Sequence, residues 1–115
     1  KREGAVLMGK EFFAYLLRCA DNSIYAGYTT DVKARERAHN AGKGAKYTRT
    51  RRPVQLVYYE SFDDKKEALK REAAYKRLTR QEKIALIERE NPKAAVLLRK
   101  SGIIRQNAGR GEMRR

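Results

Sequence analysis

Cysteine, histidine and long apolar runs are scarce in this sequence. Its 115 residues include one cysteine, Cys19, and one histidine, so an intramolecular disulfide cannot form and a metal site built from several Cys or His ligands is excluded. Apolar runs fall far short of the roughly 20 residues that span a bilayer, and the start of the chain lacks the apolar core of a secretory signal. We therefore expect a soluble protein of the reducing cytoplasm with no membrane partner, and a buried Cys19 rather than a reactive thiol.

Acidic residues are few beside basic ones. The chain has 28 Lys and Arg against 14 Asp and Glu, a formal net charge of +14, and an imbalance of this size points to a polyanionic partner. Residues 33–52 contain eight basic side chains and one acidic one, and residues 93–115 contain seven and one, whereas residues 53–92 are nearly balanced. The segment 33–52 is the candidate nucleic-acid surface, and a solvated basic loop is the simpler alternative.

The chain length predicts one domain, and β-favouring runs predict three strands in it. The runs FFAYLLR at 12–18 and IYAGYT at 24–29 flank a turn signal at 21–23, which indicates a β-hairpin. The run VQLVYYE at 54–60 alternates apolar and polar residues and predicts a third strand. With helices flanking the sheet in the order β-β-α-β-α-α-α, we expect an α+β fold with a small, largely antiparallel three-stranded sheet.

Capping signals and periodicity predict four helices. They cover residues 32–40, 64–78, 79–90 and 91–104, and a basic loop or irregular helix fills 42–53. In the second helix, the apolar positions Ala68, Leu69, Tyr75 and Leu78 recur at helical spacing and are expected to pack on the sheet. Leu69 and Ala73 are expected to mark the buried side, with Glu72 near its apolar edge. Residues 9–90 form the expected main domain, residues 1–8 are expected to be disordered or foreign sequence before a natural start at Met8, and residues 105–115 form a mobile basic tail.

The hairpin brings two tyrosines together. Facing residues of an antiparallel pair have position numbers with a constant sum, and a turn near residue 20 or 21 makes that sum about 40 or 42. Because either sum is even, we expect Tyr15 and Tyr25 on one face and close together. An aromatic pair in the core is the simpler interpretation, and a shared site is the alternative. Gly27 weakens the second strand unless backbone or a ligand must approach it closely.

Three polar side chains are candidates for chemistry on a phosphodiester. Arg35 and His39 are four residues apart on the first predicted helix and share a face. An arginine can neutralise charge on a phosphate and a histidine can relay a proton, although a lone helical histidine is more often a surface or capping residue. Glu72 can hold a hydrated Mg²⁺ that also touches a phosphate, or form an ordinary ion pair with Lys76.

The order of these residues resembles the GIY-YIG nuclease family, in particular its small stand-alone bacterial members. The matching segments are FAY at 13–15, YAG at 25–27, DVKAR at 31–35 with His39 and Asn40, GKGAKYT at 42–48, RRP at 51–53, and Arg71-Glu72 with Lys76. The resemblance covers about residues 12–88. Phe13 replaces the glycine of the family's first motif, and Glu36 stands where an aliphatic residue often follows the arginine, which questions how the first helix is seated.

The resemblance implies an enzyme that hydrolyses phosphodiester bonds in DNA with one divalent metal, Mg²⁺ or Mn²⁺. Tyr15 and Tyr25 would shape the site, and one of them would help to deprotonate the attacking water. Arg35 would contact the scissile phosphate, His39 would assist by hydrogen bonding, and Glu72 would bind the metal. Because a tyrosine with an ordinary pKa near 10 is a poor base at neutral pH, cationic neighbours or the metal must lower that pKa, and Arg35 is the expected neighbour.

The basic segment supplies the expected contacts to nucleic acid. The residues expected to bind it are Gly27, Lys43, Lys46, Tyr47, Arg49, Arg51, Arg52 and Lys76. Because no separate DNA-reading domain is visible, we expect an endonuclease or nickase with little sequence specificity. Branched, flapped and single-stranded DNA are among its candidate substrates, and RNA is left open. The alternative is a nucleic-acid-binding module with the same fold that cuts slowly or not at all, and the sequence leaves open a monomer or a weak dimer.

Overall fold

The structure adds one short helix to the predicted order of elements. It is a computed structural model that describes residues 10–100. The elements are β1 (Phe12–Arg18), β2 (Ile24–Thr29), α2 (Val32–Asn40), α3 (Lys46–Arg49), β3 (Gln55–Phe62), α4 (Lys65–Arg77), α5 (Arg80–Glu90) and α6 (Pro92–Lys100). The added helix, α3, lies within the segment predicted to be a basic loop or irregular helix. The predicted terminal segments 1–8 and 105–115, and the part of the last predicted helix beyond residue 100, lie outside the described residues.

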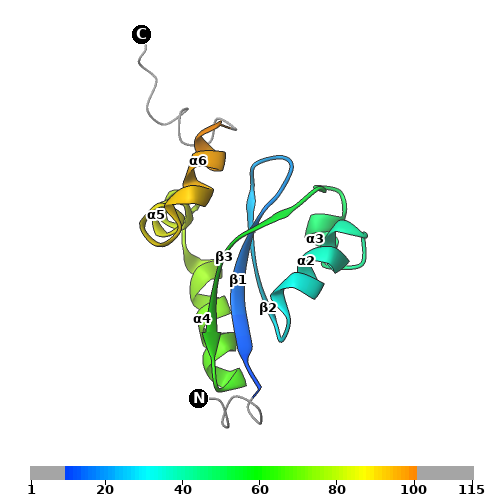
Figure 1. Cartoon of the computed structure of the whole chain (residues 1–115), viewed down its shortest axis with the longest axis vertical. Helices are drawn as coiled ribbons and strands as arrows, with labels where there is room; N and C mark the ends of the chain where they lie inside the picture. Colours follow the sequence, from blue (N-terminus) through cyan, green and yellow to red (C-terminus); the bar gives the residue numbers. More distant parts are fainter. Residues whose placement is uncertain (1–9, 101–115) are drawn as a thin grey trace.

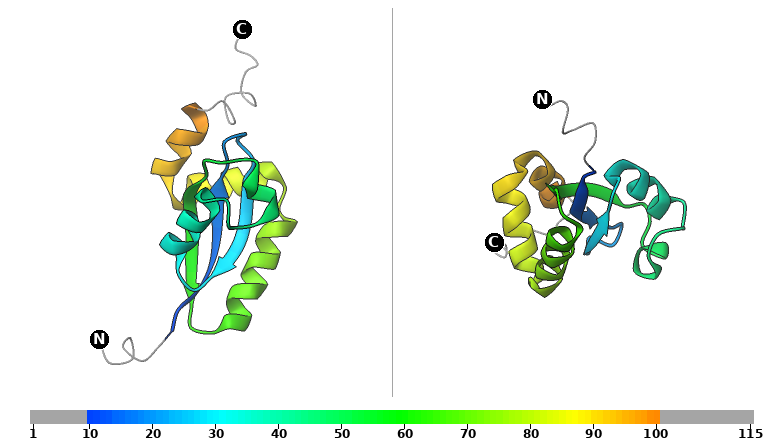
Figure 2. Two further views of the ribbon diagram at one scale, coloured as in Figure 1. Left: turned by 90° about the vertical axis from the view of Figure 1, so that its right-hand side faces the viewer. Right: turned by 90° about the horizontal axis from the view of Figure 1, so that it is seen from below.

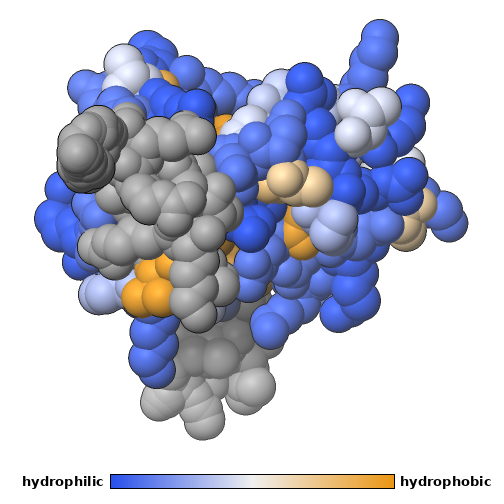
Figure 3. Space-filling view, turned by 90° about the horizontal axis from the view of Figure 1, so that it is seen from above, coloured by the Kyte–Doolittle hydropathy of each residue, from blue (hydrophilic) through white to orange (hydrophobic). Residues whose placement is uncertain are grey.

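The three strands form one antiparallel sheet in the order β2-β1-β3, which confirms the predicted α+β class. Helices α4, α5 and α6 pack on one face of the sheet, and α2 and α3 lie on the other (Figures 1 and 2). Because β1 is the central strand and is covered on both faces, residues 14–17 are all buried. The surface seen in Figure 3 is mostly hydrophilic. No helix within residues 10–100 has the length and apolar character needed to cross a bilayer.

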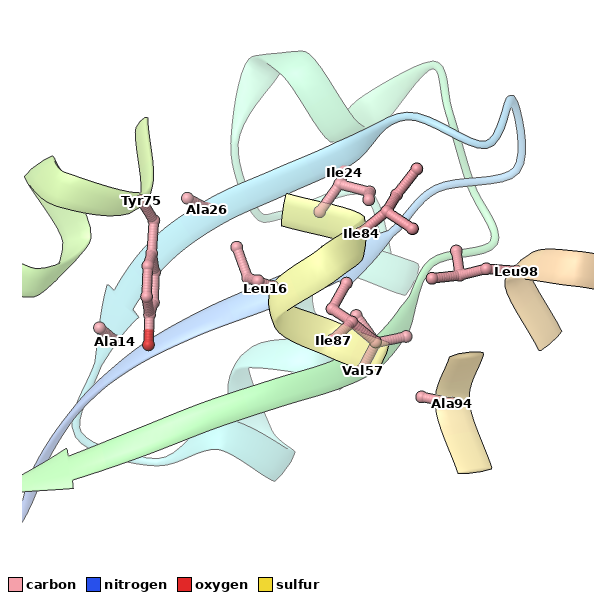
Figure 4. Close-up of a cluster of buried hydrophobic side chains, with 10 residues drawn as sticks. All are labelled: Ala14, Leu16, Ile24, Ala26, Val57, Tyr75, Ile84, Ile87, Ala94 and Leu98. Atoms are coloured by element: carbon pink, nitrogen blue, oxygen red, sulfur yellow. The ribbon is translucent and has the colours of Figure 1, made fainter. Parts of the chain in front are cut away.

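The larger core lies between the sheet and α4, α5 and α6 (Figure 4). Its buried residues are Ala14, Leu16, Ile24, Ala26, Val57, Tyr75, Ile84, Ile87, Ala94 and Leu98. Helix α5 begins with the predicted capping box, in which Thr79 and Glu82 each accept a hydrogen bond from the backbone of the other. This cap fixes where α5 starts, and therefore which of its side chains reach the core.

Helix α4 packs part of its predicted apolar face on the sheet. Ala68 and Tyr75 are buried, as predicted, whereas Leu69 is 38% exposed and Ala73 is also exposed. The prediction that Leu69 and Ala73 mark the buried side is therefore wrong, because the small Ala68 allows close approach to the sheet and the Tyr75 ring fills the core. Glu72 lies four residues after Ala68 and three before Tyr75, so it shares their side of the helix.

Strand β3 contains a bulge that interrupts its alternating pattern. Its register against β1 shifts at Val57, which has no partner residue in β1. Leu56 consequently packs against the smaller core, on the face of β1 that holds Tyr15, and Tyr59 is the pairing partner of Tyr15. The backbone N–H of Leu56 donates to Glu36 Oε2 at 2.8 Å. Glu36, which follows Arg35 in the sequence, therefore helps to hold α2 against β3 through this hydrogen bond.

Helix α2 is fixed at both of its ends. Asn40 donates from Nδ2 to Val54 O at 3.0 Å and accepts at Oδ1 from Val54 N at 2.7 Å, which ties the end of the helix to the start of β3. At its beginning, Asp31 accepts a hydrogen bond from Ala34 N at 3.0 Å. The side chains that α2 turns toward the sheet are therefore held in defined positions.

Candidate active site

Tyr15 and Tyr25 lie on the same face of the hairpin, as the even position sum predicts. Tyr15 is paired with Gly27 and Leu17 with Tyr25, so the tyrosines are diagonal neighbours with ring centroids 6.5 Å apart. The smaller core consists of Tyr15, Leu17, Cys19 and Val54, which confirms the buried Cys19. Tyr15 is 2% exposed and Tyr25 is partly buried. The pair therefore extends from the smaller core to the protein surface, where it can form one wall of a site.

His39 is fully buried and connects Tyr15 to helix α3. Its Nε2 lies 2.9 Å from Tyr15 Oη, and its Nδ1 lies 2.7 Å from Thr48 Oγ1. Because Thr48 Oγ1 donates to Ala45 O at 3.0 Å, it accepts from Nδ1–H, which leaves Nε2 to accept from the Tyr15 hydroxyl. A contact from Ala45 N to Nδ1, at 3.4 Å, is too long to compete. The interpretation of His39 as a surface or capping residue is therefore wrong.

Two glycines make room for this chain of hydrogen bonds. A Cβ at Gly27 would overlap Cζ and Oη of Tyr15, and a Cβ at Gly44 would overlap the ring of His39. The close approach that Gly27 was expected to allow is thus made by the Tyr15 phenol. Gly44 and Thr48 are site residues that the sequence reasoning missed. The available signal was Gly44 itself, because Gly42 already supplies a glycine just after the helix and a second glycine two residues later needs its own reason.

Arg35 and Glu72 come from different helices and both act on the Tyr15 phenol. Burial raises the pKa of Tyr15 to about 12. Interaction with Arg35 lowers the pKa, and electrostatic interaction with Tyr25 and with the Glu72 carboxylate raises it. The structure thus brings Tyr25, Arg35 and His39 together at the Tyr15 phenol, and the charge of Glu72, on α4 at the other face of the sheet, also acts on it. In this structure burial outweighs the effect of Arg35, so the pKa of Tyr15 lies above its ordinary value and the phenol is protonated at neutral pH.

His39 gives the stability of the protein a pH dependence. Burial, and secondarily the charge of Arg35, lower the pKa of His39 from its ordinary 6.5. Below that value the unfolded chain binds a proton that the folded protein does not, so the free energy of unfolding decreases as the pH falls from 6.5 toward the lowered pKa. The slope is at most about 1.4 kcal/mol per pH unit for one proton. Urea unfolding across this range measures it, and an equal slope in His39→Gln would assign it to other groups.

Glu72 is the candidate metal ligand. Its side chain is 19% exposed and its Oε2 lies 3.2 Å from Lys76 Nζ, so the ordinary ion pair does form. Within residues 10–100, no three His, Cys, Asp or Glu side chains gather where they could hold a metal ion. Mg²⁺ in phosphoryl-transfer sites nevertheless keeps several waters and binds through one or two carboxylates plus substrate phosphates. Glu72 therefore fits a metal shared with the substrate rather than one enclosed by the protein.

The basic segment contains two groups of side chains. Arg51 Nε lies 2.9 Å from Asp21 Oδ2, and Arg52 Nε donates to Arg49 O at 2.9 Å, so both guanidinium groups help to hold the segment together. In segment 33–52, the exposed basic side chains that take part in neither an ion pair nor a side-chain hydrogen bond are those of Lys33, Arg37, Lys43, Lys46 and Arg49. These five have the most freedom to contact phosphates.

Tyr47 joins the basic segment to the tyrosine pair. Its ring stacks on Tyr25 with centroids 5.8 Å apart and 20° between the planes, and the Arg51 guanidinium lies 3.9 Å from its centroid. Although Tyr47 is 41% exposed, a base could stack on the face that Arg51 covers only if Arg51 moved. Arg51 therefore competes within the protein for the Tyr47 ring if this predicted nucleic-acid contact is made by stacking on a base.

Comparison with known proteins identifies the family of the chain. The family model described as the GIY-YIG catalytic domain matches residues 11–85. The UPF0213 protein SH2523 of Staphylococcus haemolyticus is 58% identical over 76 residues, which cover 66% of this chain and 93% of that protein. The UPF0213 protein lmo0166 of Listeria monocytogenes is 57% identical over 81 residues, which cover 70% and 90%. The solution NMR structure of the UPF0213 protein BH0048 from Bacillus halodurans, 42% identical, aligns with a TM-score of 0.50 over 74% of this chain and 90% of that one. The chain therefore belongs to the GIY-YIG nuclease family, among small bacterial members similar to the UPF0213 proteins.

Proposed function

We propose that this protein is a metal-dependent DNA endonuclease or nickase of the cytoplasm with little sequence specificity. Its family implies a nucleic-acid substrate. The observation that best supports hydrolysis is that His39 and Arg35, both on α2, interact with the hydroxyl of Tyr15 on β1, and that the charge of Glu72 on α4 also acts on this phenol. A protein that only bound nucleic acid would not need a proton acceptor, a cation and a carboxylate that all act on one phenol.

Tyr15 and His39 form a proton relay in this proposal. Because the pKa of Tyr15 is raised to about 12, the phenol is not ionised beforehand. It accepts a proton from the attacking water at Oη while its own proton passes to Nε2 of His39. The lowered pKa of His39 keeps Nε2 free of a proton before the reaction, and Nδ1–H, which donates to Thr48, stabilises the imidazolium that forms.

Arg35 and Glu72 act on the phosphate in this proposal. The guanidinium of Arg35 neutralises negative charge that grows on the scissile group. Glu72 would hold one Mg²⁺ or Mn²⁺ ion, which when bound supplies Lewis-acid stabilisation of the charged oxygens. Lys76, which pairs with Glu72 at 3.2 Å, is then available to a neighbouring phosphate. This exchange of partners is consistent with Lys76 as a nucleic-acid contact.

Binding to DNA is expected to weaken steeply with salt. If about six phosphates are neutralised, the logarithm of the affinity falls with the logarithm of the salt concentration with a slope of about −5. Lys46→Ala is expected to reduce that slope by about one. Lys70→Ala is the matched control, because Lys70 lies on α4 and already pairs with Glu67 at 3.5 Å. Fluorescence anisotropy at several NaCl concentrations measures both, and affinity that hardly responds to salt would contradict the basic surface.

The alternative is a nucleic-acid-binding module that uses the same basic surface and does not cut. Both functions predict DNA binding, and only the first predicts cleavage. The test incubates purified protein with supercoiled plasmid and with duplex, branched, flapped and single-stranded DNA in Mg²⁺, Mn²⁺ or EDTA. Metal-dependent cleavage that is absent from a parallel Glu72→Gln preparation supports the enzyme. No cleavage of any substrate by the wild type supports the binding module.

A further inference from the structure

A second aromatic pair lies on the sheet next to Tyr15. Tyr59 on β3 is the pairing partner of Tyr15, so the two side chains share a face and their Cβ atoms lie about 5 Å apart. Phe13 precedes Tyr15 by two residues and therefore also lies on this face. The rings of Phe13 and Tyr59 meet edge to face, with centroids 5.6 Å apart and 78° between their planes. The bulge at Val57 produces this arrangement by setting the register of β3.

The Tyr59 ring is open to solvent. It is 49% exposed, and in the part of the chain that the structure describes the other exposed large hydrophobic residues are Tyr47, Leu69 and Val96, all on helices. Polar side chains lie near this pair in the sheet: Glu11, just before β1, and Ser61 on β3 are both exposed. The Phe13–Tyr59 pair is therefore a small aromatic surface in polar surroundings. Interfaces with protein partners need a wider apolar patch than this.

We propose that Phe13 and Tyr59 stack an unpaired base of the DNA strand whose phosphate lies at Tyr15 and Arg35. This rests on the proposed function and deepens it, because it makes single-stranded or flapped DNA the preferred substrate. Exposed aromatic residues on a sheet are suited to stacking on unpaired bases, and such stacking tolerates any base sequence. In a continuous duplex both faces of each base are already stacked on neighbouring base pairs, so the platform has nothing to bind.

Charge favours a nucleic-acid occupant over an apolar peptide or a second copy of the chain. The chain has a net charge of +14, and Arg35 interacts with Tyr15, the neighbour of Tyr59. In this proposal, a strand bound by its phosphate at this cation continues across β1 to Tyr59 on β3. A second copy would bring the same excess of positive charge to this face.

The test measures binding of fluorescently labelled oligothymidylate, and of a fully paired duplex of equal length, in EDTA so that nothing is cut. Tyr59→Leu is expected to weaken binding of the single strand by about 5- to 100-fold, the effect of losing one base stack, and to leave duplex binding nearly unchanged. Phe13→Leu is also expected to weaken binding of the single strand and to leave duplex binding nearly unchanged. Tyr59→Phe retains the ring and is expected to bind like the wild type, as is Leu69→Ala, which removes an exposed apolar side chain from α4. Circular dichroism and thermal unfolding verify that each variant is folded.

The outcomes separate this inference from the proposed function. Equal loss of duplex and single-strand affinity in Tyr59→Leu, or no loss of either, would overturn the platform whether or not the wild type cleaves DNA. A change in sedimentation with unchanged affinity would assign the surface to contacts between copies and also overturn it. Selective loss of single-strand affinity supports the platform even if the wild type cuts no substrate. In that case the nuclease proposal fails and the binding site remains.

Discussion

Replacement of Glu72 by glutamine is expected to lower metal-dependent DNA cleavage by about 10³-fold or more. A divalent ion at the phosphate supplies several kcal/mol of charge stabilisation, and each 1.4 kcal/mol or so is tenfold in rate. Glutamine retains the size of the side chain but not the charge that attracts the ion. The partly exposed pair with Lys76 at 3.2 Å is worth at most about 1 kcal/mol, so the fold and DNA binding in EDTA are expected to persist.

Glu67→Gln is the matched control for this variant. Glu67 lies in the first turn of α4, and its exposed carboxylate pairs with Lys70 at 3.5 Å. Its neutralisation makes the same change in net charge on the same helix, and cleavage is expected to remain at the wild-type rate. If both variants cleave equally well, the metal is not held by Glu72. Titration of Mg²⁺ in a plasmid-nicking assay distinguishes a weakened metal site, which more Mg²⁺ restores, from a lost one.

The tyrosine pair could be predicted because strand pairing has a fixed period. An even position sum was enough to place Tyr15 and Tyr25 on one face, and the observed pairing of Tyr15 with Gly27 satisfies it. The start of α5 was predictable for a similar reason, since a capping box is a local motif with defined spacing. Features that depend on neighbours along the chain were therefore available from the sequence alone.

Features that depend on packing between distant elements could not be predicted from the sequence. The apolar pattern of α4 correctly included Ala68 and Tyr75, but it also placed Leu69 and Ala73 on the buried side. Both are exposed, because which side is buried depends on how closely Ala68 approaches the sheet. The bulge at Val57 could not be seen in an alternating run, yet it places Tyr59 beside Tyr15. The burial of His39 depends on Gly44 and Thr48 in a later segment.

The pKa of Tyr15 shows most clearly why the sequence was insufficient. The sequence offers a cation, Arg35, and this cation does lower the pKa of the phenol, but burial raises it more and the value reaches about 12. Desolvation cannot be estimated until the surrounding atoms are placed. In the proposed mechanism, Tyr15 therefore does not act as an ionised base but passes its proton to His39.

Substitution of Tyr15 by phenylalanine is expected to lower kcat for DNA cleavage by about 10²- to 10⁴-fold, the usual contribution of a positioned proton acceptor, with DNA binding retained. Only Oη is removed, so the ring still fills the space beside Gly27, while Nε2 of His39 loses its partner at 2.9 Å at a cost of about 1–3 kcal/mol in the free energy of unfolding. Tyr25→Phe is the matched control, and its loss is expected to be smaller. In the wild type, cleavage should also decline as the pH falls through the pKa of His39, which burial lowers from the ordinary 6.5, because protonated Nε2 cannot accept a proton, and this decline should disappear in Tyr15→Phe. A greater loss of kcat in Tyr25→Phe than in Tyr15→Phe would show that the water is deprotonated through the other tyrosine and that the relay through His39 is wrong.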